Sequence, residues 1–173
     1  TWMSAHGDGT DIYFRLFDQD GAPQGDEILV HETHHSDAQK NPDVAMDASG
    51  NFIIVWDGSG PGDADGVWAR CYNPAGVHWD DLFQANLSTS GVQEMPAVAM
   101  AADGAFVVTY TDRGAGTPLV RYHLFDGAWT SLGEFPAAST PGSEAGTSSV
   151  AMDREGNFVV VWDEQNGDVE GWG

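Results

Sequence analysis

The sequence has 173 residues, which is long enough to bury a hydrophobic core and is typical of one domain. It carries 27 Asp and Glu against 6 Lys and Arg, and a net charge of -21 repels nucleic acid and anionic lipid, so neither is an expected partner. No apolar run approaches the roughly 18 residues of a membrane-spanning helix, so membrane insertion is not expected. The single cysteine, Cys71, excludes an intrachain disulfide and is expected to be a buried thiol. Because the chain begins at Thr1 without a Met or a signal-like segment, we expect it to be a piece of a longer chain.

The first strand-like stretch of the chain is TDIYFRLF, residues 10–17. It returns as DGVWARCY at 65–72 and as PLVRYHLF at 118–125, and each copy is followed by a turn and a short apolar stretch. Alternation of apolar residues in these stretches predicts strands with two different faces.

A second pattern precedes two of these copies and closes the chain. PDVAMDASGNFIIVWD at 42–57 returns as PAVAMAADGAFVVTYTD at 96–112 and as SVAMDREGNFVVVWD at 149–163. The spacing between Val44, Val98 and Val150 is a little over about fifty residues, a period typical of propellers, solenoids and repeat arrays. The continuous apolar run in NFIIVW and NFVVVW indicates a strand that is buried on both faces.

The turn inside this pattern has its own chemistry. DASGN, AADGA and DREGN place Gly fourth, as a turn with a glycine at positive φ requires, so the flanking segments are predicted to form a hairpin. Asp47, Asp103 and Asp153 are therefore interpreted as turn formers and not as catalytic acids.

Together these elements predict an all-β fold. We expect a β-propeller-like array of four-stranded antiparallel blades, with about three repeats and an incomplete blade at both ends; a β-sandwich is the alternative. Residues 1–173 form a single repeat domain in this prediction. Its parts are a partial repeat at 1–41, repeats at 42–95 and 96–148, and a partial repeat at 149–173.

The stretch HETHH, residues 31–35, fits the H-E-x-x-H pattern of zinc peptidases. That pattern binds zinc only on a helix, and the polar sequence that follows it does not predict one. In the other repeats the same position holds ANLST and AASTP, so we expect a loop or strand end. His31, His34 and His35 are interpreted only as a surface site for adventitious metal.

The frame P-x-V-A-M-D-x-x-G-N-F-V-V-V-W resembles tandem repeats of large secreted or surface proteins of bacteria. Those proteins often carry calcium-binding or adhesion modules, and the resemblance covers nearly the whole chain. Its V-A-x-D-x-x-G-N turn is also loosely similar to NHL-type propeller repeats. The resemblance implies an extracellular or cell-surface location, but no catalytic motif.

Acidic residues gather in the loop that follows the buried strand. DGSGPGDADG at 57–66 and DEQNGDVEG at 163–171 combine carboxylates with glycines, as a calcium site does. A solvated acidic turn, or adaptation to a saline habitat, would leave the same pattern. The calcium candidates are Asp57, Asp63, Asp65, Asp163, Asp168 and Glu170.

The tryptophans suggest a different function. Trp2, Trp56, Tyr110 and Trp162 share one repeat position and are expected to be core residues. Trp68, Trp79 and Trp129 do not recur as a set, which makes them candidates for exposed rings that stack on sugars.

The sequence contains no G-x-S-x-G, P-loop or C-x-x-C motif, so we do not expect an enzyme. The main hypothesis is a non-enzymatic extracellular structural or adhesion module, self-assembling through strand or blade completion between chains. The alternative is a carbohydrate-binding, lectin-like propeller, and a glycoside-acting enzyme is less favoured. Expected partners are further copies in a homo-oligomer or filament, neighbouring repeats of a longer chain, or glycans.

Overall fold

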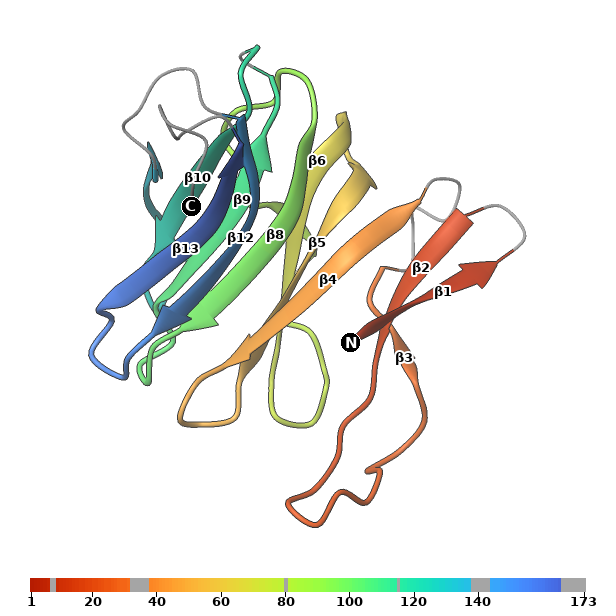
Figure 1. Cartoon of the computed structure of the whole chain (residues 1–173). Helices are drawn as coiled ribbons and strands as arrows, with labels where there is room; N and C mark the ends of the chain where they lie inside the picture. Colours follow the sequence, from red (N-terminus) through yellow and green to blue (C-terminus); the bar gives the residue numbers. More distant parts are fainter. Residues whose placement is uncertain (7–8, 32–37, 80, 115, 138–143, 166–173) are drawn as a thin grey trace.

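The computed structural model describes residues 1–6, 9–31, 38–79, 81–114, 116–137 and 144–165. These residues form thirteen β-strands in four antiparallel sheets (Figure 1). The prediction of an all-β fold is therefore confirmed. No helix that could cross a membrane is found within the described ranges.

The sheets follow one another along the chain. Sheet 1 contains β1 (Trp2–His6), β2 (Gly9–Phe14) and β3 (Ile28–Leu29). Sheet 2 contains β4 (Gln39–Met46), β5 (Phe52–Gly60), β6 (Asp63–Tyr72) and β7 (Phe83–Gln84). Sheet 3 contains β8 (Gln93–Met100), β9 (Phe106–Asp112), β10 (Leu119–Phe125) and β11 (Ser131–Pro136). Sheet 4 is the hairpin of β12 (Glu144–Met152) and β13 (Phe158–Gln165).

The register of the strands reproduces the sequence repeat. Val44 pairs with Ile54, Val98 with Val108, and Val150 with Val160, so the three predicted hairpins have the same alignment. In sheets 2 and 3 the hairpin continues into two further antiparallel strands. The expectation of four strands in each full repeat is thus confirmed. Four sheets, where a β-sandwich has two, argue against the sandwich alternative.

The predicted turns are also confirmed. The Asp47 Oδ1 atom accepts hydrogen bonds from the backbone N–H groups of Ser49 and Asn51, and Asp153 makes the equivalent pair in the last hairpin. The Asp103 carboxylate accepts one from the N–H of Ala105. Each turn closes with a glycine at positive φ: Gly50 at 83°, Gly104 at 90° and Gly156 at 91°.

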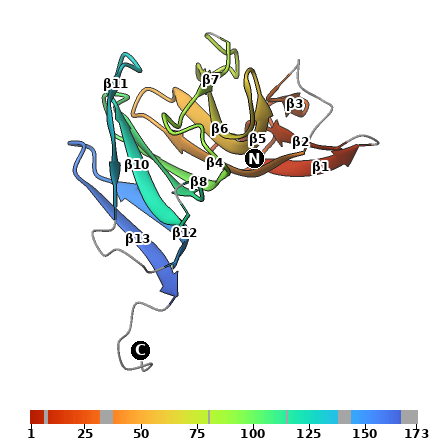
Figure 2. The same cartoon turned by 90° about the horizontal axis from the view of Figure 1, so that it is seen from above.

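The sheets pack face to face, and Figure 2 shows them in chain order, with sheet 1 at one end and sheet 4 at the other. Strand β5 is buried on both faces, as predicted. Phe52, Ile54 and Trp56 pack with Ile12 and other residues of sheet 1. Ile53 and Val55 pack against sheet 3. A continuous apolar strand is therefore the consequence of its position between two sheets.

The predicted core position at the end of the apolar strand is occupied by buried aromatic residues in sheets 2 and 3, whereas the equivalent Trp2 and Trp162 are only partly buried. Trp56 is 1% exposed and donates its indole N–H to the side-chain oxygen of Gln39, 2.8 Å away. Tyr110 is fully buried and donates its hydroxyl to Glu134. Burial raises the pKa of Tyr110 above its usual range, so the hydroxyl keeps its proton. Cys71 is buried too, as expected.

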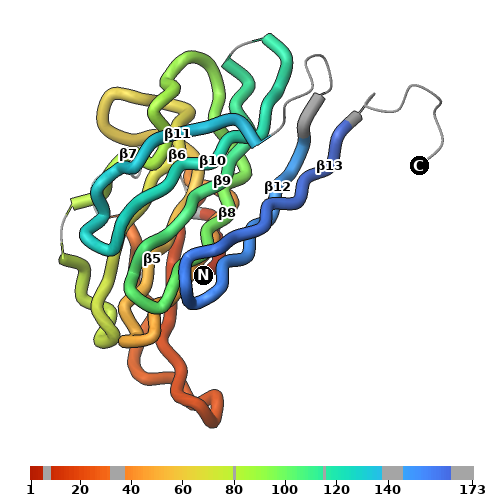
Figure 3. The backbone as a smooth tube through the Cα atoms, turned by 90° about the vertical axis from the view of Figure 1, so that its left-hand side faces the viewer, coloured from red at the N-terminus to blue at the C-terminus, as the bar shows by residue number. Residues whose placement is uncertain are grey.

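Sheet 4 differs from the others on its outer face. The hairpin lies beside β8 and β9, which cover its inner face (Figure 3). On the outer face Val159 and Val161 are each 59% exposed, whereas the equivalent Ile53 and Val55 of β5 are fully buried. The same sequence pattern thus has a different environment in the last repeat, because no sheet among the described residues covers that face.

Candidate functional site

Two tryptophans stack where sheets 2 and 3 meet. The ring centroids of Trp79 and Trp129 lie 4.9 Å apart, with 16° between the planes. Trp79 is 44% exposed, and Trp129 packs partly against the core. The stack therefore combines a supported ring with a ring that is open to solvent.

Equivalent turns of successive repeats hold the two rings. After β6, the Asn73 side-chain oxygen accepts hydrogen bonds from the N–H groups of Ala75 and Val77, just before Trp79. After β10, Asp126 accepts from the N–H groups of Ala128 and Thr130, on either side of Trp129. Trp129 itself has a φ of 63°, a conformation that is uncommon for a bulky side chain. The turns fix the backbone, so the rings are positioned before any ligand arrives.

Two cavities border the stack. A cavity of about 100 Å³ is lined by both tryptophans together with Asp47, Asn51 and Asp103. A second cavity, of about 250 Å³, is lined by Trp129, Asp81 and Phe83. An aromatic surface with carboxylates at its edge can hold a ligand that has one apolar face and several hydroxyl groups.

The three tryptophan candidates therefore have different environments. Trp79 and Trp129 are brought together, as a ligand platform requires. Trp68 is only 3% exposed, lies in the core between sheets 1 and 2, and donates its indole N–H to the Gly58 carbonyl oxygen. Its assignment as a sugar-stacking ring is wrong, because β6 turns that side chain toward the preceding sheet.

The described acidic loop residues lie on strands β5, β6 and β13, and Asp57 and Asp65 line the same cavity. Asp63 accepts hydrogen bonds from the Gln84 amide at 2.6 Å and from the N–H of Asp65. Asp57 is buried on β5, and Asp163 is exposed on β13. Asp168 and Glu170 lie outside the described residues. Within the described ranges, no group of three or more His, Cys, Asp or Glu is placed to hold a metal ion. Calcium binding stays a prediction.

The histidine stretch is described only at its first residue. His31 follows β3 and is 1% exposed, and its Nε2 atom lies 3.2 Å from the N–H of Ile12, which donates to it. The description of His31 as part of a surface metal site is therefore wrong. His34 and His35 lie outside the described residues.

Sequence reasoning missed Lys40 and Glu94, which line a further cavity together with Asp57. Lys40 and Glu94 occupy the same register position in successive repeats, opposite Asp57 and Thr111. The sequence does contain a signal for them, because one repeat position carries a positive charge at Lys40 and a negative charge at Glu94.

No family model matches the sequence, and no curated protein matches it. The resemblance to bacterial tandem repeats therefore stays a prediction. Among solved structures, the chain is similar to endo-arabinase from Bacteroides thetaiotaomicron VPI-5482, with 14% identity and a TM-score of 0.50. The match covers 92% of this chain and 62% of that chain. At this identity the likeness shows the fold alone.

This likeness corrects the main functional hypothesis. The solved structure that shares this fold is an endo-arabinase, and this finding stands against the hypothesis of a non-enzymatic structural or adhesion module. The hypothesis of a self-assembling adhesion module is therefore wrong, and its carbohydrate-binding alternative is the better supported one. The expected partners and the extracellular location stay predictions.

Proposed function

We propose that this chain is a carbohydrate-binding protein with a β-propeller-like arrangement of sheets, and that Trp79 and Trp129 form its sugar-binding platform. The observation that carries the proposal is the stack of these two rings beside two cavities. The fold likeness to an endo-arabinase agrees with a carbohydrate ligand.

The chemistry of the platform suits a sugar ring. One face of a pyranose or furanose carries C–H groups, which pack on an indole, while the hydroxyl groups at its edge need hydrogen-bond acceptors. Asp47 and Asp103 line the smaller cavity and Asp81 the larger one, so each cavity at the stack has a carboxylate that can accept hydrogen bonds.

The charge of the protein narrows the class of glycan. The net charge of -21 repels acidic polysaccharides, and the three carboxylates at the cavities add to this repulsion locally. We therefore expect neutral oligosaccharides, arabinan fragments among them, to bind better than uronic-acid polymers.

The β-propeller-like arrangement rests on the repeat. Each full repeat is one four-stranded antiparallel sheet, and successive sheets pack in chain order through equivalent residues. A propeller blade has this description. Small-angle scattering that fits two stacked sheets better than a radial array of four would contradict this part of the proposal.

Binding is tested by titrating neutral oligosaccharides while tryptophan fluorescence and calorimetry are recorded. Trp79→Ala is expected to weaken binding by roughly tenfold or more, as loss of a central aromatic contact does. Phe17→Ala is the matched control, because Phe17 is an aromatic residue that is 58% exposed, follows β2 and lines neither cavity at the stack. A broad glycan array without any signal, or equal losses in the two variants, would contradict the proposal.

We further propose that binding occurs without turnover. Asp47 and Asp103 line the cavity that both tryptophans share, and both carboxylates accept backbone hydrogen bonds within their turns, which is a structural role. Release of reducing sugar from a bound oligosaccharide, lost on changing a single carboxylate, would overturn this part.

A further inference from the structure

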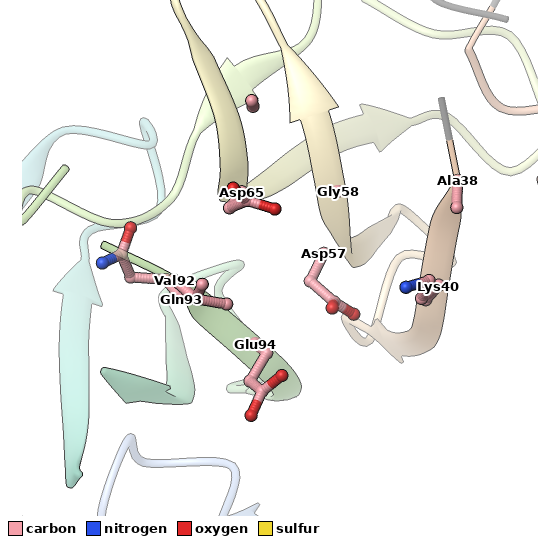
Figure 4. A pocket seen from close by; sticks show the side chains of 9 residues that line it. Ala38, Lys40, Asp57, Gly58, Asp65, Val92, Gln93 and Glu94 are labelled. Carbon is pink, nitrogen blue, oxygen red and sulfur yellow. The ribbon is translucent and has the colours of Figure 1, made fainter. Parts of the chain in front are cut away.

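A separate cavity of about 340 Å³ lies between sheets 2 and 3, away from the tryptophan stack. Its lining includes Lys40 from β4, Asp57 from β5, Asp65 from β6 and Glu94 from β8 (Figure 4). The volume is in the range of cavities that bind small molecules.

Asp57 is the unusual residue of this cavity. It is 7% exposed, and its Oδ1 atom has no hydrogen-bond partner among the described residues. A buried acceptor without a partner costs about 1–3 kcal/mol, because it has lost its water. In Figure 4 its carboxylate lies between Glu94 and Lys40, at the edge of the open space.

The next repeat shows how the same position is satisfied by a contact within the chain. Thr111 is equivalent to Asp57, since both pair with the first residues of the preceding strand in the same register. The Thr111 hydroxyl donates a hydrogen bond to the Gly146 carbonyl oxygen of sheet 4. The Asp57 Oδ1 atom has no such contact among the described residues, so this atom is open to a donor from outside the chain.

The charged residues around Asp57 indicate which kind of hydrogen-bond donor would bind there. The cavity is lined by three acids, Asp57, Asp65 and Glu94, and by one base, Lys40. Arg113 pairs with Glu94 at the protein surface, which still leaves one more acid than base. The excess negative charge favours a cation, and the size of the cavity favours one that carries further atoms.

An organic cation fits these residues better than a metal ion. The described acids of the cavity do not form a group of three placed for metal coordination. An ammonium group is compact and carries three donors, so it can bond to Asp57 and still reach a second acceptor. Hydroxyl groups on the same ligand would meet Asp65, Glu94 and Lys40 in the rest of the cavity.

We propose that this cavity binds a small polyol that bears a primary ammonium group, of the amino-sugar class, with the Asp57 carboxylate as its charge partner. The groups that face the ligand are Asp57, Asp65, Glu94 and Lys40. Burial raises the pKa of Asp57 to about 6, repulsion from Glu94 acts in the same direction, and a hydrogen bond with Asn41 opposes both. Binding should therefore weaken as the pH falls through about 6, because Asp57 then takes up a proton.

Calorimetry with glucosamine tests the proposal, with glucose, N-acetylglucosamine and ethanolamine as the comparison ligands. At about pH 7 glucosamine should bind roughly tenfold or more tightly than either uncharged sugar, and most of this preference should be lost at about pH 5. Glucosamine that binds no better than glucose would overturn the proposal. Ethanolamine that binds as tightly as glucosamine would overturn the amino-sugar class.

Substitutions at Asp57 and at an equivalent exposed residue test whether glucosamine binds in this cavity. Asp57→Asn keeps the shape of the side chain and should weaken glucosamine binding by roughly tenfold or more. Asp163→Asn is the matched control, because Asp163 holds the equivalent position on β13 but is exposed. Asp57→Asn should leave the binding of neutral oligosaccharides unchanged, because Asp57 lines neither cavity at the tryptophan stack, so the two proposals are tested separately. Equal affinities for Asp57→Asn and the unaltered protein would place the ligand elsewhere.

Discussion

The Arg70 guanidinium donates a hydrogen bond from Nη1 to the carbonyl oxygen of Val30, 2.7 Å away in the segment that closes sheet 1. The contact recurs one repeat later, where His123 Nδ1 lies 2.7 Å from the carbonyl oxygen of Ala85. The N–H of Val30 donates to the carbonyl oxygen of Ile12 in β2, the middle strand of sheet 1, and the N–H of Ala85 donates to that of Val67 in β6, the third strand of sheet 2. A hydrogen bond from the third strand of one sheet to the end of the preceding sheet is therefore part of the repeat.

We expect Arg70→Met to destabilise the protein by about 1–3 kcal/mol, since it leaves a buried carbonyl oxygen with only the 3.4 Å contact from the Tyr72 hydroxyl. Urea unfolding measures the change. Arg154→Met is the control, because Arg154 is 83% exposed and pairs only with neighbouring Glu155. The control should change the free energy of unfolding by less than about 0.5 kcal/mol. Similar losses in both variants would show that the contact between the sheets contributes nothing specific.

Two valines at one repeat position test the packing of the sheets. Val55 is fully buried against sheet 3, whereas Val161 is 59% exposed on sheet 4. Val55→Thr should cost about 1–3 kcal/mol, because it buries a hydroxyl among apolar side chains. Val161→Thr should stay within about 0.5 kcal/mol of the unaltered protein. A large loss at Val161 in thermal unfolding would mean that another surface covers it in solution.

Much of the fold follows from local sequence. The hairpin around Gly50 is encoded by a run of apolar residues on each side of an Asp-initiated turn, and both signals lie within about sixteen residues. Repetition strengthens this prediction, because three copies of the pattern predict the same hairpin. The difference in burial between Val55 and Val161 is not encoded locally, because the two copies of the repeat have nearly the same sequence. It depends on whether another sheet packs against that face.

The candidate site was harder to predict for the same reason. Trp68 and Trp79 lie close together in sequence, yet one is in the core and the other on the surface. Strand alternation would have placed Trp68 on the face of Arg70 and Tyr72, and only the preceding sheet shows that this face is buried. Trp79 stacks on Trp129 only because turns from two different repeats meet. A local sequence pattern cannot predict such a contact.

Calcium binding can be tested against the charge of the whole chain. A net charge of -21 should destabilise the folded state through self-repulsion, and an ion that binds only the folded state would relieve it. If the acidic loops bind calcium, the melting temperature should rise more in millimolar calcium than in magnesium at matched ionic strength. Asp63→Asn should then reduce the difference. An equal response to the two ions would indicate screening alone.

Asp57 should make the protein less stable as the pH rises from about 4 to about 6. Its carboxyl has a pKa of about 6 in the folded protein against 3.8 for the group in water, chiefly because of burial. Between these two pKa values the folded chain keeps a proton on Asp57 that the unfolded chain releases. Asp57 therefore lowers the free energy of unfolding as the pH rises, by up to about 3 kcal/mol in total. Above about pH 6 this loss of stability no longer changes with pH. Asp57→Asn removes the ionisable group, so without ligand the variant should be more stable than the unaltered protein at pH 7. The advantage should shrink toward zero near pH 4, as followed by urea unfolding across that range. Asp163→Asn, at the exposed equivalent position, should show no such trend. A difference between Asp57→Asn and the unaltered protein that does not vary with pH would mean that Asp57 is solvated in the folded protein.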